Sequence, residues 1–231
     1  MSDRVLLVMD DAFALSTMAA ALKLHGTNVI GEAQKKSSAI LLMRSLQPNV
    51  LLIDMHLSDE HSIEIASAIR KESPSIGIVM LVACADLRLL GEITSDIPHG
   101  TKMVIKKSMN SVTALCDVIS ESRSFVPESP VTWVNGNVSM HEKALENLMS
   151  HLTDLQIETL RLVADGLTNA EISRMRFVSE KAIEQIVSRI AMVLNVQPDR
   201  SKNLRVQLVG EYFKWIGAPR HYFSSSLYLQ R

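Results

Sequence analysis

The stretch RVLLVMDD, residues 4–11, joins a short, almost wholly apolar run to two carboxylates that follow it directly. A run this short, with branched side chains and no polar alternation, is typical of a β-strand covered on both faces, as in a parallel sheet. Asp10 and Asp11 then fall where such a strand ends, at the sheet edge where functional groups gather. The stretch therefore predicts a parallel sheet and marks one of its edges.

Further runs of the same kind follow within the first 121 residues, separated by segments with helical spacing. The runs are NVIGEA (28–33), NVLLID (49–54), IGIVMLVA (76–83) and KMVIK (102–106). The helical segments are AFALSTMAAALKLHG (12–26), SSAILLMRSLQ (37–47), SIEIASAIRKES (62–73), LRLLGEITSD (87–96) and SVTALCDVISES (111–122). Gly26 fits just past the end of the first helix. Five β–α units in a row predict a doubly wound α/β domain, (βα)5, over residues 1–121.

Composition and charge are those of a soluble chain whose two ends differ. Hydrophobic residues make up 47% and charged residues 21%, and no apolar run approaches the roughly 18 residues that span a bilayer. The N-terminus does not read as a signal peptide, and two distant cysteines favour free thiols, so we expect a cytoplasmic protein with no membrane partner. Residues 1–121 carry 11 basic and 14 acidic side chains, whereas residues 151–231 carry 11 and 8. The basic excess at the second end suggests a polyanionic partner.

Charged side chains end alternate strands of the predicted sheet. Asp10 and Asp11 follow the first strand, Asp54 ends the third, and Lys106 ends the fifth. If the first and third strands are adjacent, as in doubly wound sheets, these groups meet at one edge. Clustered carboxylates repel one another unless a hard cation binds them, and oxygen ligands suit Mg²⁺. A cation and a lysine beside one carboxylate would let it attack a phosphorus centre, because both neutralise developing charge.

The stretches VLLVMDD, NVLLIDMHL and VIKKS, within residues 4–121, resemble the receiver domain of bacterial two-component response regulators. The resemblance implies that Asp54 accepts a phosphoryl group from a sensor histidine kinase or a small phosphodonor. It also implies that Asp11, Asp54 and the carbonyl of His56 bind Mg²⁺ directly, that Asp10 binds it through water, and that Lys106 binds the phosphoryl group.

Several positions depart from the receiver pattern. Ser58 and Ser62 stand where receivers usually have Pro and Gly after the third strand. Val82 replaces the Thr or Ser that bonds a phosphoryl oxygen, and Met103 replaces an aromatic that follows it inward. A hydrogen bond to a charged group contributes about 1.5–3 kcal/mol, a large part of what biases a two-state switch. We therefore expect phosphorylation to be weakly coupled to output.

The chain changes character after residue 121. Residues 122–147 contain SRSFVPESPVTWVNGNVS, which is rich in turn-forming residues and reads as a linker, and MHEKALENLM (140–149) could form a short helix. Residues 148–231 look all-helical. TDLQ (153–156) and TNAE (168–171) have the pattern of capping boxes, Gly166 lies just past a helix end, and Ser179 and Ser201 are expected to cap the last two helices.

The run LTDLQIETLRLVADGLTNAEISRMRFVSEKAIEQIVSRIAMVLNV, residues 152–196, resembles the LuxR-type helix-turn-helix of NarL/LuxR regulators. The match includes the Leu-Thr opening, Ala164 and Gly166 at the first helix end, and Ser179 before the long helix. The resemblance implies a DNA-binding domain over residues 148–231, whose helix from about Glu180 to Asn195 enters the major groove, and a homodimer on paired half-sites of double-stranded DNA.

That helix is amphipathic. Its buried stripe is expected to include Ala182, Ile183, Ile186, Ile190 and Val193 or Leu194, opposite the polar candidates Lys181, Glu184, Gln185, Ser188 and Arg189. Arg189 can pair with guanine, Gln185 with adenine and Glu184 with cytosine. Lys181, and Arg200 beyond the helix, are better placed for phosphate. Because Ala182, Ile186 and Val193 replace residues that are often polar in this family, we expect modest affinity.

Other interpretations stay open. The receiver could have stopped using phosphate and be controlled by a ligand, a partner or its dimer interface. A Mg²⁺-dependent phosphohydrolase is disfavoured because His56 stands where its second acid would be and no cap domain is available, so we expect no enzyme. The chain could also be an interaction protein that no longer binds DNA. Six of the ten aromatic residues lie at the C-terminal end, where the last helix is expected to bury some and the tail APRHYFSSSLYLQR could pack on a partner.

Overall fold

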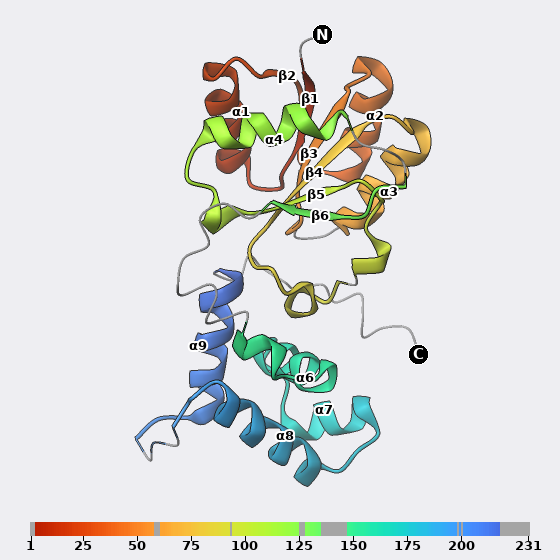
Figure 1. The fold of residues 1–231 in the computed structure, drawn as a ribbon. Helices are drawn as coiled ribbons and strands as arrows, with labels where there is room; N and C mark the ends of the chain where they lie inside the picture. Colours follow the sequence, from red (N-terminus) through yellow and green to blue (C-terminus); the bar gives the residue numbers. More distant parts are fainter. Residues whose placement is uncertain are drawn as a thin grey trace. The chain divides into compact units, whose positions relative to one another are not determined.

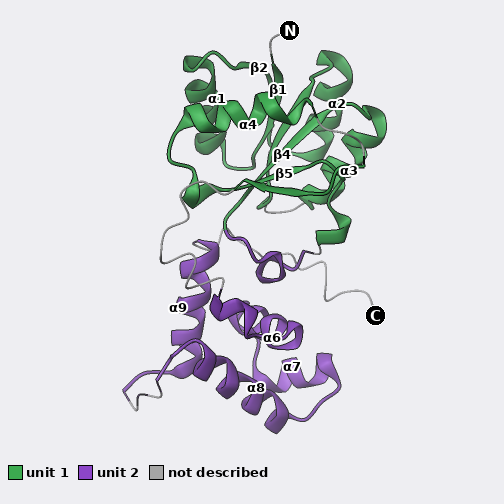
Figure 2. Ribbon diagram, in the orientation of Figure 1, with its two compact units in different colours: residues 1–83, 94–138, 223–231 green, residues 84–93, 139–222 purple. Residues whose placement is uncertain are grey.

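The computed structural model describes residues 3–57, 61–92, 94–124, 128–134, 147–197, 199 and 201–217. The chain forms two compact units (Figure 2). Unit 1 draws on residues 1–83 and 94–138, and unit 2 on residues 84–93 and 139–222. No helix in the described ranges is long and apolar enough to cross a membrane.

Unit 1 is built on a parallel sheet of six strands in the order β2-β1-β3-β4-β5-β6 (Figure 1). The strands are β1 (Arg4–Val8), β2 (Asn28–Ala33), β3 (Val50–Asp54), β4 (Gly77–Val82), β5 (Lys102–Ile105) and β6 (Thr132–Val134). Every residue of β3 and β4 is buried, as central strands covered on both faces require. The predicted doubly wound α/β fold is confirmed, with the first and third strands adjacent.

Two pairs of helices cover the two faces of the sheet. α1 (Ala12–Leu24) and α4 (Val112–Ser122) lie on one face, where Leu15, Leu22 and Leu115 join a core with alternate residues of the strands. α2 (Lys36–Leu46) and α3 (Ser62–Glu72) contact each other on the opposite face (Figure 1). Gly26, with φ +85°, lies just past the end of α1 as expected.

The helix expected over residues 87–96 is a wrong prediction. The chain instead forms two short 3₁₀ turns, η1 (Leu87–Leu90) and η2 (Thr94–Asp96). Gly91 adopts a left-handed conformation, φ +78°, and its N–H donates to the Arg88 carbonyl, which closes η1 after four residues. Glycine takes this conformation at no steric cost. Gly91 therefore ends η1, at a position where a longer helix would otherwise continue.

Strand β6 lies within the stretch that the sequence pattern assigns to a linker. It pairs in parallel with β5, with Thr132 opposite Lys102 and Trp133 opposite Met103. The N–H of Thr132 donates to the Thr101 carbonyl at 2.9 Å. The sheet of unit 1 therefore continues beyond residue 121. The only signal in the sequence is the β-favouring triplet TWV, which is too short to stand out among turn-forming neighbours.

Unit 2 contains α6 (Asp154–Ala164), α7 (Asn169–Arg176), α8 (Glu180–Val193) and α9 (Leu204–Ile216). The predicted capping box at Thr153 is complete. The one predicted at Thr168 is only half formed, because the Thr168 side chain accepts from the Glu171 N–H while the Glu171 carboxylate pairs with Arg174. Ser179 caps α8. The cap predicted at Ser201 is wrong. Asn203 caps α9 by accepting from the N–H groups of Arg205 and Val206, while Ser201 donates to Asp199. Asparagine is the equally good cap that stands closer to the apolar run.

The core of unit 2 gathers apolar residues from all four helices, with Ile157, Leu160, Ile183, Ile190 and Leu208 at its centre. Tyr212 and Trp215 are buried in it, so the prediction that the last helix buries part of the aromatic cluster is confirmed. Residues 147–150 are helical. The beginning of the short helix expected over 140–149, and the aromatic tail from residue 218 onward, lie outside the described residues.

Candidate functional site

Asp54 is the centre of the candidate site in unit 1. It ends β3 and its side chain is fully buried. One carboxylate oxygen accepts from the main-chain N–H of His56 at 3.0 Å, and the other accepts from Lys106 Nζ at 2.6 Å. Lys106 directly follows β5, and its side chain is 33% exposed. The predicted meeting of the central Asp with the Lys after the fifth strand is thus present in the structure.

The acid pair after β1 is arranged differently. Asp11 is the N-cap of α1, and its Oδ1 accepts from the N–H of Ala14 at 2.7 Å. The carbonyl of Asp10 accepts from the Gln34 side chain at 3.0 Å. Among the residues that the structure describes, no three His, Cys, Asp or Glu side chains are grouped so that they could hold a metal ion. The structure brings Asp54 and Lys106 together but does not gather Asp10, Asp11 and Asp54 into one cluster.

The donor set nevertheless has the chemistry that Mg²⁺ prefers. Asp11 uses one oxygen for its cap, and a carboxylate can accept at its second oxygen while the cap stays in place. The carbonyl of His56 is a neutral oxygen donor of the kind that magnesium sites include. The charge of Lys106 already stabilises the Asp54 carboxylate in a buried place, and charge-assisted bonds are the stronger class of hydrogen bond. The arrangement suits a carboxylate that attacks an electrophilic phosphorus.

The two atypical switch positions are fully buried. Val82 ends β4 and Met103 lies in β5, and each has 0% of its surface exposed. Met103 pairs with Met80, and Val82 with Ile105. Neither side chain carries a hydroxyl or a ring that could report a phosphoryl group, in agreement with the sequence.

Ser62 has a role at this site that the sequence pattern does not reveal. It begins α3 and is 1% exposed. Its hydroxyl donates to the carbonyls of Asp54 at 2.8 Å and Met55 at 3.0 Å. The residue therefore ties α3 to the main chain of the acceptor. The departure from the usual glycine was visible in the sequence, but nothing there indicated what the hydroxyl contacts. Ser58 lies outside the described residues.

A second candidate site lies on α8 in unit 2. The polar residues predicted to face DNA are all exposed: Lys181, Glu184, Gln185, Ser188 and Arg189. The Ser188 hydroxyl donates to the carbonyl of Glu184 at 2.8 Å, so it is partly engaged within the helix. Arg200 lies outside the described residues.

The opposite face of α8 is apolar. The predicted stripe holds for Ile183, Ile190 and Leu194, which are buried, while Ala182, Ile186 and Val193 are half-buried. Val187 and Ala191 are also buried and complete the stripe. Burial of this face fixes which side of α8 is presented to solvent.

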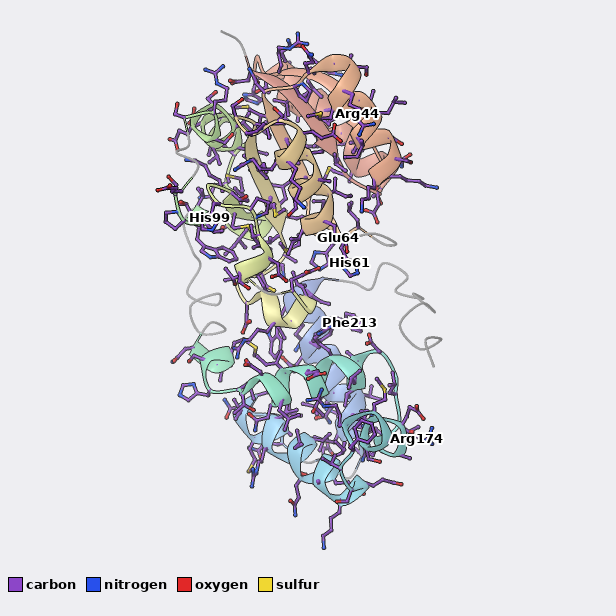
Figure 3. All side chains as sticks on the ribbon, turned by 90° about the vertical axis from the view of Figure 1, so that its right-hand side faces the viewer. Arg44, His61, Glu64, His99, Arg174 and Phe213 are labelled. Atoms are coloured by element: carbon purple, nitrogen blue, oxygen red, sulfur yellow. The ribbon has the colours of Figure 1, made fainter. Side chains whose placement is uncertain are left out.

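Neighbouring cations are held in local pairs. Arg176 pairs with Glu158 at 2.5 Å, and Arg174, which projects from α7 in Figure 3, pairs with Glu171 at 2.5 Å. Lys181 and Arg189 take part in no ion pair within the described part of unit 2. These two side chains can therefore meet a polyanion without first breaking a pair.

Comparison with known proteins identifies the two units. Residues 5–119 match the family described as response regulator receiver domain, and residues 150–201 match the bacterial regulatory proteins of the luxR family. The DNA-binding transcriptional activator EvgA of Escherichia coli K12 is 22% identical over 185 residues, which cover 80% of this chain and 88% of EvgA. The response regulator protein VraR of Staphylococcus epidermidis is 29% identical over 178 residues, which cover 75% of this chain and 80% of VraR.

Solved structures share the fold of the chain. The two-component response regulator RcsB in a complex with DNA has a TM-score of 0.52 at 22% identity and covers 94% of this chain and 100% of its own. A structure of two RcsB dimers bound to two parallel DNAs has a TM-score of 0.54 at 21% identity, with the same coverage. The chain therefore belongs to the DNA-binding transcriptional response regulators of the NarL/LuxR type, which join a receiver domain to a LuxR-type helix-turn-helix.

Proposed function

We propose that this protein regulates transcription by binding double-stranded DNA through the exposed polar face of α8. The observation that carries the proposal is the polarity of this helix: a buried apolar stripe on one side and Lys181, Gln185 and Arg189 exposed on the other. Arg189 and Gln185 have the donor patterns that read guanine and adenine in the major groove, and Glu184 can accept from cytosine. Lys181, with Arg200 beyond the helix, would contact phosphate and set the position of the helix.

The proposed assembly on DNA is a homodimer bound to two half-sites. The similar protein RcsB has been solved as two dimers bound to two parallel DNAs, and a single helix with as little basic charge as α8 binds weakly by itself. Two recognition helices on paired half-sites would double the number of contacts to DNA, with the same side chains used twice. The protein would act in the cytoplasm, where the DNA and a sensor kinase are both accessible.

The second part of the proposal is that Asp54 accepts a phosphoryl group, from a sensor histidine kinase or from a small phosphodonor. The buried Asp54–Lys106 pair supports it. Asp11, Asp54 and the carbonyl of His56 would hold Mg²⁺, with Asp10 acting through water. When bound, the cation would neutralise charge on the incoming phosphoryl oxygens. Lys106 would stabilise the same charge from the other side, and Ser62 would keep the acceptor's main chain fixed.

Phosphorylation would be poorly coupled to DNA binding, because Val82 and Met103 lack the groups that normally report it. The competing proposal is a receiver that no longer uses phosphate and responds to a ligand, a partner or its own dimer interface. The buried, hydroxyl-free Val82 favours it specifically. Under that alternative, Asp54→Asn leaves DNA binding and regulation unchanged.

DNA binding is tested by fluorescence anisotropy with a duplex enriched from a random-sequence pool, titrated with salt. We expect Arg189→Ala to weaken binding about tenfold or more, since a bidentate base contact contributes about 1–3 kcal/mol. Lys214→Ala is the matched control, because it removes one exposed positive charge from α9 that is already paired with Glu211. Salt-insensitive binding, or equal losses in the two variants, would refute the proposed interface.

Phosphorylation is tested by intact mass after incubation with Mg²⁺ and an acyl phosphate. An adduct is expected in the natural chain, and none in Asp54→Asn or after chelation of Mg²⁺. An adduct that persists in Asp54→Asn would place the acceptor elsewhere. The absence of any adduct, with DNA binding intact, would favour the phosphate-independent alternative.

A further inference from the structure

The residues that follow β4 belong to the core of unit 2, although they lie within the stretch of sequence that matches the receiver family. We call residues 84–92 the clasp. Leu89 is 0% exposed and Cys84 is 6% exposed, and both are part of the core cluster that includes Met149, Leu152 and Tyr212. The helical unit is thus not made only of the C-terminal part of the chain.

Arg88 is the main polar anchor of the clasp. Its Nη1 donates to the carbonyl of Leu152 at 3.2 Å and to Asp154 Oδ1 at 2.8 Å, and its Nη2 donates to the carbonyl of Met149 at 3.1 Å. Nη2 and Nε of Arg88 also donate to the two carboxylate oxygens of Asp86, at 2.7 Å and 2.9 Å. Hydrogen bonding to Asp86 is the largest of the causes that raise the pKa of Arg88 above its usual range. One side chain therefore joins the clasp to the residues that lead into α6.

Two further contacts fix the clasp. The buried Tyr212 hydroxyl donates to the carbonyl of Leu89 at 2.7 Å, which ties the clasp to α9. Gly91 lies so close to the guanidinium of Arg161 on α6 that a Cβ at this position would collide with it. The Arg88 guanidinium and the Tyr212 hydroxyl therefore fix the clasp independently, one to the residues that lead into α6 and the other to α9.

The clasp is joined by a short path to the acceptor site. Asp54 lies opposite Leu81 in the sheet, and the N–H of Met55 donates to the Leu81 carbonyl at 2.9 Å. The chain then runs through Val82 and Ala83 into the clasp. A shift of the main chain at Asp54 would be passed to the end of β4, and from there along the chain to residues that are fixed in the helical unit.

We propose that the weak coupling that remains between the Asp54 site and the DNA-binding unit, without a hydroxyl and aromatic switch, runs through the clasp, by the main chain after β4 and the anchor at Arg88. The proposal rests on the proposed function, which assigns phosphoryl acceptance to Asp54 and DNA binding to α8. It goes beyond that function by naming the coupling element and the residue on which coupling depends. Among the described residues, the hydrogen bonds between the clasp and the helical unit go to the residues before α6, to α6 and to α9, and none of them goes to the polar face of α8. The clasp would therefore act by changing the order of α6 and α9 and not by covering the DNA-reading residues.

The experiment is amide hydrogen exchange on the full chain in a double-mutant cycle: natural chain, Asp54→Asn, Arg88→Ala and the double variant. Arg88→Ala is expected to raise exchange at residues 84–92 and at the start of α6 about tenfold, since the hydrogen bonds from a charged group to Asp154 and to the carbonyls of Met149 and Leu152 are lost. Arg44→Ala is the matched control, because Arg44 makes a two-bond pair with Glu72 in unit 1; it should change exchange only near α2 and α3.

The coupling itself is read from Asp54→Asn. This variant is expected to change exchange in α6 and α9, and Arg88→Ala is expected to abolish that change. If Asp54→Asn leaves unit 2 unaltered, or if the two effects simply add, the clasp is not the coupling element. Tyr212→Phe, which removes one hydroxyl, gives the same comparison if Arg88→Ala lowers the yield of folded protein. The readout needs neither DNA nor a phosphodonor, so failure of the proposed function would be seen separately in the binding and mass measurements.

Discussion

Replacing Lys106 by Met should destabilise unit 1 more than the loss of any exposed ion pair would. Asp54 is 0% exposed and its Oδ2 lies 2.6 Å from Lys106 Nζ. Removing one partner of a buried pair typically costs about 3–5 kcal/mol, because a charge is left buried without compensation. Lys106 itself is 33% exposed, and water screens part of its charge. We therefore expect a loss of about 2 kcal/mol, which corresponds to about a thirtyfold increase in the opening equilibrium.

The assay is amide exchange at Leu51, Leu52 and Ile53, which lie in the fully buried β3 and report the opening of unit 1. The double variant Lys106→Met/Asp54→Asn should recover most of the loss, because the uncompensated charge is then absent. A change that Asp54→Asn does not reverse would mean that packing of the lysine stem, and not its charge, is what stabilises the site.

Lys36→Met is the control for this experiment. Lys36 pairs with Glu64, labelled in Figure 3, at 3.1 Å, and the two side chains are 42% and 61% exposed. An exposed pair of this kind contributes less than about 1 kcal/mol. Equal effects of Lys36→Met and Lys106→Met would refute the view that Asp54 is a buried carboxylate held by one cation.

Three further outcomes are expected. Gly77→Ala should lower the stability of unit 1 to urea by about 1–3 kcal/mol, because a Cβ there would lie 2.5 Å from Ser122 Oγ and 2.7 Å from its carbonyl; Ser122→Ala should not rescue it. Thr153→Ala should cost about 1 kcal/mol in the thermal stability of unit 2, since it removes half of the capping box of α6. Hydrogen bonds from Ser201 hold the pKa of Asp199 below its ordinary value of 3.8, so the stability of this turn is present above about pH 3.8 and is lost as the pH falls through the lower folded value. An NMR titration of the Ser201 amide should show this loss, and Asp199→Asn should flatten the curve.

The sheet and its acceptor were predictable because the apolar runs carry a signal that depends only on burial. Strands covered on both faces must be apolar at every position, and β3 and β4 are buried throughout. The meeting of Asp54 with Lys106 follows from strand order alone. The role of Asp11 as the N-cap of α1 does not follow from strand order. A carboxylate at this position can either cap the helix or face a cation, and the local geometry decides between the two.

The wrong predictions share a physical cause. The apolar spacing of residues 87–96 fits a helix, yet Gly91 ends the turn and the apolar side chains of Leu89 and Leu90 pack in unit 2 instead. Periodicity shows which residues seek burial but not which core will bury them. In the same way, Ser201 and Asn203 are both good caps, and only the geometry of the preceding turn decides between them. Arg200 and the aromatic tail lie outside the described residues, so those predictions stay predictions.

The short strand β6 determines what a fragment of this protein would do in a test tube. With β6 in place, Lys102, Met103 and Val104 of β5 are paired on their outer side, and the edge of the sheet on this side is a strand of only three residues. A chain cut at residue 121 would instead leave β5, whose middle and end are fully apolar and buried, as an open edge. Open, apolar edges pair with other chains, so such a fragment should aggregate, while one that runs through Val134 should stay monodisperse.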